Sequence, residues 1–261
     1  MGKFVMIGER IHCISPAIRE AMAKQDPGPI LTRAKEQLES GAAYLDVNIG
    51  PAESNGEALM KWAVQLLQEH FDNVPLSLDT ANRKAIAAGL SVYNRAKGKP
   101  IINSADAGDR IENIDLAAAN GAIVLSLCSK SGVPSNNDER MAYCQQMLER
   151  GLSLGMEAED LWFDPLFLVI KGMQDKQMDV LEFIRQCSEM GLMTTGGLSN
   201  ASNGMPKHIR PIMNSALVAM AMMSGLASAI VNPCEQRLNE TIRSCDVIRN
   251  NCLYADSYLE I

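Results

Sequence analysis

Short apolar runs alternate with longer stretches of helical periodicity along the chain, and this alternation constrains the fold more than any other feature. The runs predict strands, and each is followed by apolar residues at helical spacing. The expected strands are residues 3–7, 43–49, 75–79, 100–103, 122–127, 161–163, 193–198 and 228–231. The expected helices are residues 29–40, 56–70, 82–93, 111–120, 137–154, 179–190, 212–225 and 234–251. Eight strand–helix units in succession favour a parallel sheet closed into a barrel.

The length agrees with one such barrel. A β/α barrel needs about 250 residues, and the chain has 261, with 47% AVILMFWYC to build a core. We therefore expect an α/β fold, a single (β/α)8 TIM barrel spanning 1–261 as one domain. A Rossmann sheet is the alternative, but residues 8–12 (GERIH) lack the glycine spacing of a dinucleotide fingerprint.

Charge and composition exclude several classes of partner. The net charge of −7 argues against nucleic acid and anionic membranes as partners, and no apolar run reaches the roughly 20 residues of a membrane span. The seven cysteines are odd in number and irregularly spaced, and no signal peptide precedes them, so we expect reduced thiols in a cytoplasmic protein. The three histidines have no metal-ligand spacing, and we expect this chain to bind no metal.

Polar residues recur at the carboxyl ends of the expected strands, which meet at one mouth of a barrel. Asp and Asn also cap helices and form turns, so any one of them has a structural alternative. Asn48 lies inside an apolar run, where a capping role is harder to argue. The recurrence at seven strand ends favours a polar ligand in the mouth. The residues are Glu9, Arg10, Asp46, Asn48, Asp79, Asn103, Ser104, Asp164, Ser199, Asn200 and Asn232.

The residue types suit one kind of ligand. Carboxylates accept two N–H donors side by side, and Asn both donates and accepts. A flat heterocycle with an aminopyrimidinone edge, such as a pterin, offers the complementary groups.

The chain resembles the pterin-binding methyltransferases, which include methyltetrahydrofolate–corrinoid protein methyltransferases and the folate domain of cobalamin-dependent methionine synthase. It is similar, more distantly, to dihydropteroate synthase. The resemblance spans nearly the whole chain, in the family's order. Its segments are IGERI (7–11), LDVNIGP (45–51), LDTAN (78–82), INSAD (102–106), SGVP (131–134), FDPL (163–166), GLSNAS (197–202) and RP (210–211) followed by AMAMMSGL (219–226).

This resemblance implies roles by position. Asp79, Asn103 and Asp164 match the family's ligands to the pterin ring, and Asn200 matches the Asn that hydrogen-bonds near N5 and is the expected catalytic residue. The remaining polar lining of the pterin site is expected from Asp46, Asn48, Ser199, Arg210 and Glu9. The loop 203–209 before Arg210 is about two residues longer than in the family, and His12 replaces the Asn that usually follows GERI.

The activity implied by the resemblance is methyl transfer between N5 of tetrahydrofolate and the cobalt of a corrinoid. Tetrahydrofolate or methyltetrahydrofolate would be the substrate. The cobalamin would arrive on a partner protein that docks transiently over the barrel mouth, as in corrinoid-dependent systems of anaerobes. The resemblance also implies a homodimer, for which the Met-rich helix near 216–226 is a candidate surface. The direction of transfer stays open.

The sequence is also compatible with other functions. The chain could serve a corrinoid iron–sulfur protein of acetyl-CoA synthesis, or act as a dihydropteroate-synthase-like enzyme, to which Lys207 and Arg210 fit only in part. A Schiff-base aldolase needs a Lys at a strand end, and no expected strand ends in Lys. A folate-binding or corrinoid-delivery module is the non-enzymatic alternative.

Overall fold

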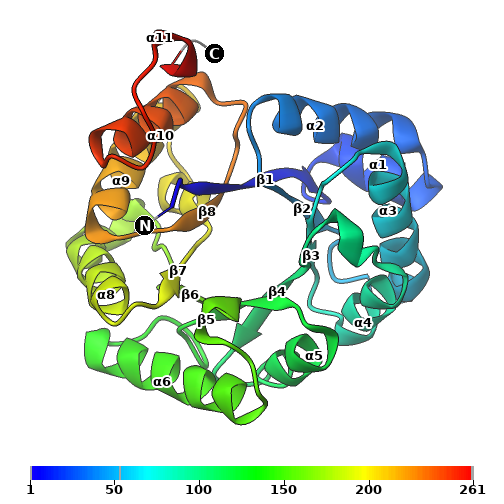
Figure 1. The fold of residues 1–261 in the computed structure, drawn as a ribbon, viewed down its shortest axis with the longest axis horizontal. Coiled ribbons are helices and arrows are strands. Elements are labelled where there is room, and N and C mark those ends of the chain that lie inside the picture. Colours follow the sequence, from blue (N-terminus) through cyan, green and yellow to red (C-terminus); the bar gives the residue numbers. More distant parts are fainter. Residues whose placement is uncertain (1, 53, 260–261) are drawn as a thin grey trace.

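Eight parallel strands form the centre of the molecule, and helices surround them (Figure 1). The computed structural model describes residues 2–52 and 54–259. The strands are β1 (Val5–His12), β2 (Tyr44–Asn48), β3 (Leu76–Asp79), β4 (Ile101–Asp106), β5 (Ile123–Leu127), β6 (Leu161–Asp164), β7 (Met193–Thr194) and β8 (Ser228–Val231).

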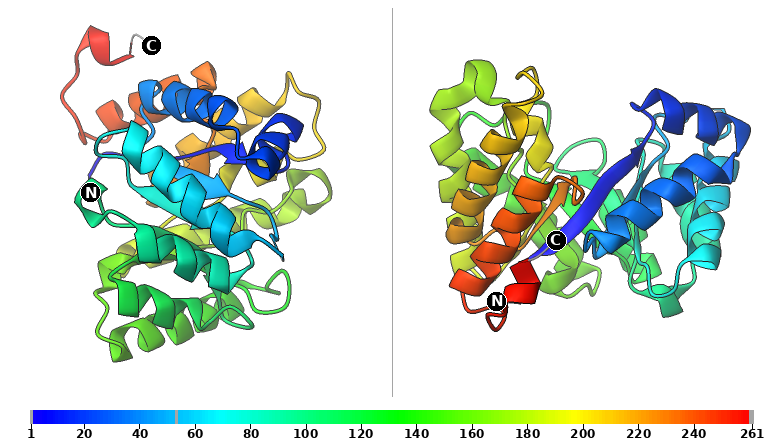
Figure 2. Two further views of the ribbon diagram at one scale, coloured as in Figure 1. Left: turned by 90° about the vertical axis from the view of Figure 1, so that its right-hand side faces the viewer. Right: turned by 90° about the horizontal axis from the view of Figure 1, so that it is seen from above.

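The helices follow the strands in sequence and lie outside them in both further views (Figure 2). They are α1 (Pro16–Lys24), α2 (Pro27–Glu39), α3 (Gly56–His70), α4 (Arg83–Val92), α5 (Asn113–Asn120), α6 (Asn137–Ser153), α7 (Ile170–Met173), α8 (Gln177–Glu189), α9 (Arg210–Ser224), α10 (Gln236–Ile248) and α11 (Asp256–Leu259). Four 3-10 helices complete the described elements: η1 (Arg95–Lys97), η2 (Ala158–Asp160), η3 (Gln174–Lys176) and η4 (Leu198–Ser202).

Strand pairing runs in the order β7-β6-β5-β4-β3-β2-β1-β8. β7 and β8 do not pair as a regular ladder, and a few backbone hydrogen bonds between the segments around them close the barrel. The amide of Ala227 donates to the carbonyl of Thr194 at 3.3 Å, and the amide of Ile230 donates to that of Gly196 at 2.9 Å. The expectation of a single (β/α)8 barrel is thus confirmed.

Two local expectations were wrong. The strand expected at 193–198 ends at Thr194, because Gly196 and Gly197 leave the strand and lead into η4. The first strand continues to His12, well beyond residue 7, and α1 follows it although no helix was expected there. Pro16 opens α1 at its first turn, a position where a proline's missing N–H costs nothing.

The inside of the barrel has two layers, because alternate residues of each strand point inward. The lower layer is apolar and contains Ile7, Ile101, Leu125 and Trp162, with Tyr44 edge-on to Trp162 at 6.0 Å between ring centroids. Two residues further along, the inward positions of β1, β2, β4 and β6 become polar, as in the step from Tyr44 to Asp46, whereas β5 continues with Leu127. The apolar layer therefore closes the barrel below, and the polar layer faces the mouth.

Candidate functional site

A polar cavity of about 550 Å³ opens at the carboxyl ends of the strands. Of the polar strand-end residues, Arg10 and Asn232 are not part of its lining, and Arg10 Nη1 instead donates to Glu36 Oε2 at 2.7 Å. The lining does include all nine residues expected at the pterin site, contributed by β1, β2, β3, β4, β6, η4 and α9. These residues are Glu9, Asp46, Asn48, Asp79, Asn103, Asp164, Ser199, Asn200 and Arg210. Side chains up to 201 positions apart in sequence thus meet at one place, as the barrel topology requires.

Asp46 and Asp79 form a coupled pair of carboxyl groups at the floor of the cavity. Asp46 accepts hydrogen bonds from Ser77 Oγ at 2.6 Å and from Asn103 Nδ2 at 3.1 Å. Asp79 accepts one from Asn48 Nδ2, whose own Oδ1 is fixed by the amide of Gly50 at 2.9 Å.

Burial and the adjacent Asp79 carboxylate raise the pKa of Asp46 well above its usual range. Burial also raises the pKa of Asp79, against the hydrogen bond from Asn48. Of the two carboxyl groups, Asp46 is therefore the one whose ionised form is disfavoured more strongly, and Asp79 is better placed to accept hydrogen bonds from a ligand.

Asp79 does not cap the helix that follows it. Asn82 is the cap of α4, and its Oδ1 accepts from the amides of Lys84 at 3.1 Å and Ala85 at 3.3 Å. The carboxyl of Asp79 is therefore free for the cavity, and the capping alternative for this residue is excluded.

Asp164 lies opposite this pair, at the end of β6. Its Oδ1 accepts from the amide of Leu166 at 2.7 Å. Burial raises its pKa to about 6, although backbone donors at Leu166 and Gly197 oppose the shift. An incoming pair of N–H donors would favour the ionised form of this carboxyl and pull the pKa back down.

A third group of side chains lines the cavity beside the Asp46–Asp79 pair and Asp164. It consists of Glu9, Ser199 and Arg210. Ser199 Oγ donates to Glu9 Oε1 at 2.8 Å, and Arg210 Nη2 donates to the carbonyl of Ser199 at 3.2 Å. Arg210 Nε also donates to Ser202 Oγ at 3.0 Å. Burial raises the pKa of Glu9, while Ser199 and the charge of Arg210 oppose that shift.

Asn200 projects from η4 beside Gly197. A Cβ at position 197 would lie 2.7 Å from Asn200 Nδ2, so any larger residue there would displace this carboxamide from its position. The carboxamide is held only loosely, by a contact of 3.5 Å between its Oδ1 and Asn203 Nδ2. Its hydrogen-bonding capacity therefore remains available to a ligand.

Sequence analysis missed Arg110 and Asn203, which also line the cavity. Arg110 Nε donates to Asp106 Oδ2 at 2.7 Å, and its Nη1 donates to Ser104 Oγ at 3.1 Å. The signal was the i,i+4 pair of Asp106 and Arg110 after the fourth strand, which by itself is common on protein surfaces. His12 also lines the cavity, and burial lowers its pKa, so it is neutral at pH 7.

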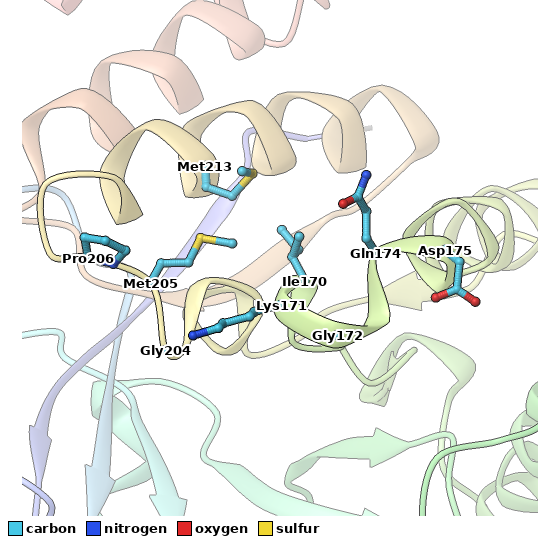
Figure 3. A pocket seen from close by; sticks show the side chains of 9 residues that line it. All are labelled: Ile170, Lys171, Gly172, Gln174, Asp175, Gly204, Met205, Pro206 and Met213. Atoms are coloured by element: carbon cyan, nitrogen blue, oxygen red, sulfur yellow. The ribbon is translucent and has the colours of Figure 1, made fainter.

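A second and larger groove lies beside the mouth, between α7 and the segment that enters α9 (Figure 3). Its volume is about 920 Å³, and its lining includes Ile170, Met205, Pro206 and Met213. It contains none of the predicted site residues and no convergent polar groups, so it is a weaker candidate than the polar cavity despite its size.

Three further observations concern metal ions, membrane spans and cysteine thiols. Within residues 2–52 and 54–259 there is no cluster of three or more His, Cys, Asp or Glu that could hold a metal ion. In the same ranges no helix is long and apolar enough to cross a membrane. All seven cysteines are free thiols, and Cys128, Cys144 and Cys187 are buried.

Comparisons with known proteins bear on this site. The profile of the family described as pterin binding enzyme matches residues 15–232. The methylcorrinoid:tetrahydrofolate methyltransferase of Eubacterium limosum is 24% identical over 254 residues, which cover 95% of this chain and 92% of that protein. The methionine synthase of Mycobacterium leprae (strain TN) is 29% identical over 244 residues, covering 87% of this chain but only 20% of that protein.

Solved structures add evidence on the fold. The 7,8-dihydropteroate synthase from Vibrio fischeri ES114 has a TM-score of 0.73 at 13% identity and covers 96% of this chain and 94% of its own. The Yersinia pestis dihydropteroate synthase has a TM-score of 0.69 at 18% identity, and the match covers 95% of this chain and 93% of that chain. Since the family profile spans β2 to β8 and with them most of the polar cavity, this chain belongs to the pterin binding enzyme family.

Proposed function

We propose that this protein is a methyltransferase that moves a methyl group between N5 of tetrahydrofolate and the cobalt of a corrinoid carried by another protein. The observation that carries the proposal is the composition of the polar cavity: carboxyl and carboxamide groups from six parts of the chain converge there, and lysine is absent from the described lining. The similarity to the E. limosum methylcorrinoid:tetrahydrofolate methyltransferase, over nearly the full length of both chains, supports the same activity.

In this proposal the pyrimidine edge of the pterin binds across the cavity floor. Asp79 and Asp164 accept its N–H donors, and Asn103 bonds to its carbonyl or ring nitrogen. Asn48 and Asp46 hold Asp79 in its acceptor role, as their hydrogen-bond network indicates. Glu9, Ser199 and Arg210 complete the wall on the N5 side.

Asn200 is proposed to act at N5. For transfer to folate, the N5 lone pair attacks the methyl carbon, the cobalt–carbon bond breaks with its electron pair going to cobalt, and the N5 proton departs. In the reverse direction N5 must be protonated before it leaves the methyl group, and Co(I) supplies the electron pair. A carboxamide that hydrogen-bonds at N5 once the folate is bound stabilises the charge that changes there in either direction.

The corrinoid must reach the methyl group from outside the barrel. We infer that a corrinoid-bearing protein docks over the mouth and leaves again after transfer, which requires a transient interface. The name of the E. limosum relative leads us to favour methylcorrinoid as donor and tetrahydrofolate as acceptor. Transfer to a corrinoid iron–sulfur protein is the same chemistry in reverse.

The test separates binding from chemistry. Wild-type protein is mixed with methyltetrahydrofolate and cob(I)alamin, and loss of the cobalt(I) absorbance is followed; the reverse reaction uses methylcobalamin and tetrahydrofolate. We expect Asn200→Ala to lower kcat by roughly 10²-fold, as loss of one preorganised donor does elsewhere, with a smaller change in folate Kd. Pterin binding without any change at cobalt would identify a folate-binding module and refute the methyltransferase. An unchanged kcat in the variant would refute the role of Asn200.

A further inference from the structure

A second, smaller cavity of about 270 Å³ adjoins the polar cavity, between the loops that follow β7 and β8. We call it the side cavity. Glu9, Ser199 and Arg210 line both spaces, so the two are contiguous. The side cavity is further lined by Lys207, Pro211, Asn214, Asn232, Glu235 and Leu238. None of these six is used by the proposed methyl transfer.

Two helices begin at the side cavity. α9 starts at Arg210 after Ile209, and α10 starts at Gln236 after Glu235. Neither cap residue accepts a side-chain hydrogen bond from its first turn. In α9, Pro211 has no amide N–H and the amide of Arg210 donates to the carbonyl of Pro206 at 3.3 Å, so the first-turn amides come mainly from α10. These amides and the positive ends of both helix dipoles favour an anion at this place.

An independent observation points to a ligand. Asn214 lines the side cavity and is only 7% exposed, yet its Oδ1 has no hydrogen-bond partner. A buried carboxamide oxygen without a partner is unfavourable, and a ligand that bonds to this carboxamide removes the cost. A 180° rotation of the carboxamide exchanges its donor and acceptor, so an anion is a suitable partner.

The charged side chains of the side cavity are mixed in sign. Lys207 is exposed on the loop before α9, and Arg210 is held in place by Ser199 and Ser202. Glu235 opposes them from the start of α10, and it is half-buried. Glu9 already accepts from Ser199. Removal of the Glu235 charge should therefore favour an anion, and removal of the Lys207 charge should disfavour it.

We propose that the side cavity binds a carboxylate of the glutamate tail of the folate, with Lys207 and Arg210 as its cations and Asn214 as a neutral partner. The inference rests on the proposed function and extends it to the tail. Its geometric basis is that the tail leaves the pterin ring at C6, the atom next to N5. With N5 at Asn200, the tail departs toward Ser199 and Arg210, which are the wall shared with the side cavity.

The experiment compares two ligands by equilibrium titration: 5-methyltetrahydrofolate, and 6-methyltetrahydropterin, which has the ring without the tail. Lys207→Ala should raise the Kd of the folate about fivefold, the size expected for one partly exposed charge, and leave the Kd of the pterin unchanged. Glu235→Gln should lower the Kd of the folate about twofold on the same basis. The control is Lys171→Ala, a lysine on the groove of Figure 3, which should change neither Kd.

Three results would overturn the tail site alone while the wild-type protein binds both ligands. The first is an unchanged folate Kd in Lys207→Ala. The second is an equal loss of folate and pterin in that variant. The third is a loss of folate in Lys171→Ala, which would place the tail in the groove of Figure 3. A wild-type protein that binds neither ligand would overturn the proposed function as well.

Discussion

Four carboxyl groups, Glu9, Asp46, Asp79 and Asp164, line a cavity that contains two arginines. In the free protein they cannot all be ionised without strong mutual repulsion, and the pKa of each is raised by burial. A ligand that donates several N–H groups stabilises the ionised carboxylates and reduces the repulsion between them. The buried carboxyl groups therefore lower the free energy of unfolding of the ligand-free protein, and a bound ligand raises it again. Such perturbed groups are common at functional sites.

Asp164→Asn should stabilise the free protein in a pH-dependent way. The folded-state pKa is about 6 and the unfolded value is 3.8, so the native state binds more protons between these pH values. Stability of the wild type thus falls as the pH rises through this window. The variant should equal the wild type near pH 4 and exceed it by about 1–3 kcal/mol at pH 7, measured by urea denaturation.

The matched control for this variant is Asp175→Asn, since Asp175 is an exposed carboxylate on η3. It should show no such trend. A difference between Asp164→Asn and the wild type that stays constant from pH 4 to 7 would contradict the assigned burial effect.

The nine residues that the sequence predicted for the pterin site lie around one cavity, because strand ends in a barrel converge whatever the loops do. The sequence could not predict the partnership of Asp46 with Asp79, since the mutual effect of two carboxyl groups on their pKa values depends on their distance and burial. It also missed Arg110, because nothing in an i,i+4 pair reveals that one member lines a cavity. The side cavity depends on the conformation of two loops, and the periodicity of apolar residues does not predict loop conformation.

At the scale of elements, the apolar strands were predictable and their exact bounds were not. β7 contains only two residues because two glycines follow it closely, and this short strand leaves the backbone free to form η4, which carries Ser199 and Asn200. α1 was missed because its apolar positions, Ile18, Ala21 and Met22, are few and its outer face is charged. Its role is to cover part of the barrel after β1.

Gly89→Ala should destabilise the protein although alanine is the better helix former. Gly89 lies on α4 against α3, and a Cβ there would approach Met60 Cγ to 2.6 Å and Leu78 Cδ1 to 3.1 Å. Overpacking costs about 1–3 kcal/mol, against a gain of about 1 kcal/mol in helix propensity. We expect a net loss of roughly 1 kcal/mol in the free energy of unfolding.

A double-mutant cycle tests the cause. In a Met60→Ala background the closest contact is gone and only the one of 3.1 Å to Leu78 Cδ1 remains, so Gly89→Ala should then cost less or be neutral. An equal loss in both backgrounds would show that the helix interface is not responsible.

At the scale of the whole molecule, one outer face lacks the charges expected of a surface helix. No charged residue occurs from position 211 to 234. On α8 and α9 the exposed fractions are 63% for Met178, 48% for Met220 and 83% for Met223, beside a cavity of about 470 Å³. Glu182 of α8 also lines this cavity, and it is paired with Arg185. For a chain of net charge −7, a face with so few charges is one on which two copies can meet with little repulsion. We propose that this face forms a homodimer with two-fold symmetry.

Met223→Glu should shift the protein from dimer to monomer in analytical ultracentrifugation, because the new carboxylates would meet near the two-fold axis. Leu152→Glu on α6 is the control, since Leu152 is 50% exposed on another side of the barrel. It should leave the sedimentation coefficient unchanged. A wild-type protein that sediments as a monomer at micromolar concentration would refute the dimer.

The central claim is that one cavity holds the pterin with its pyrimidine edge on Asp79, Asn103 and Asp164 and its N5 beside Asn200. A crystal structure with 5-methyltetrahydrofolate tests it most directly. The account predicts the ring inside the barrel mouth, Asn200 within hydrogen-bonding distance of N5, and the methyl group directed outward. A ring bound in the groove of Figure 3, or one whose N5 faces away from Asn200, would contradict it.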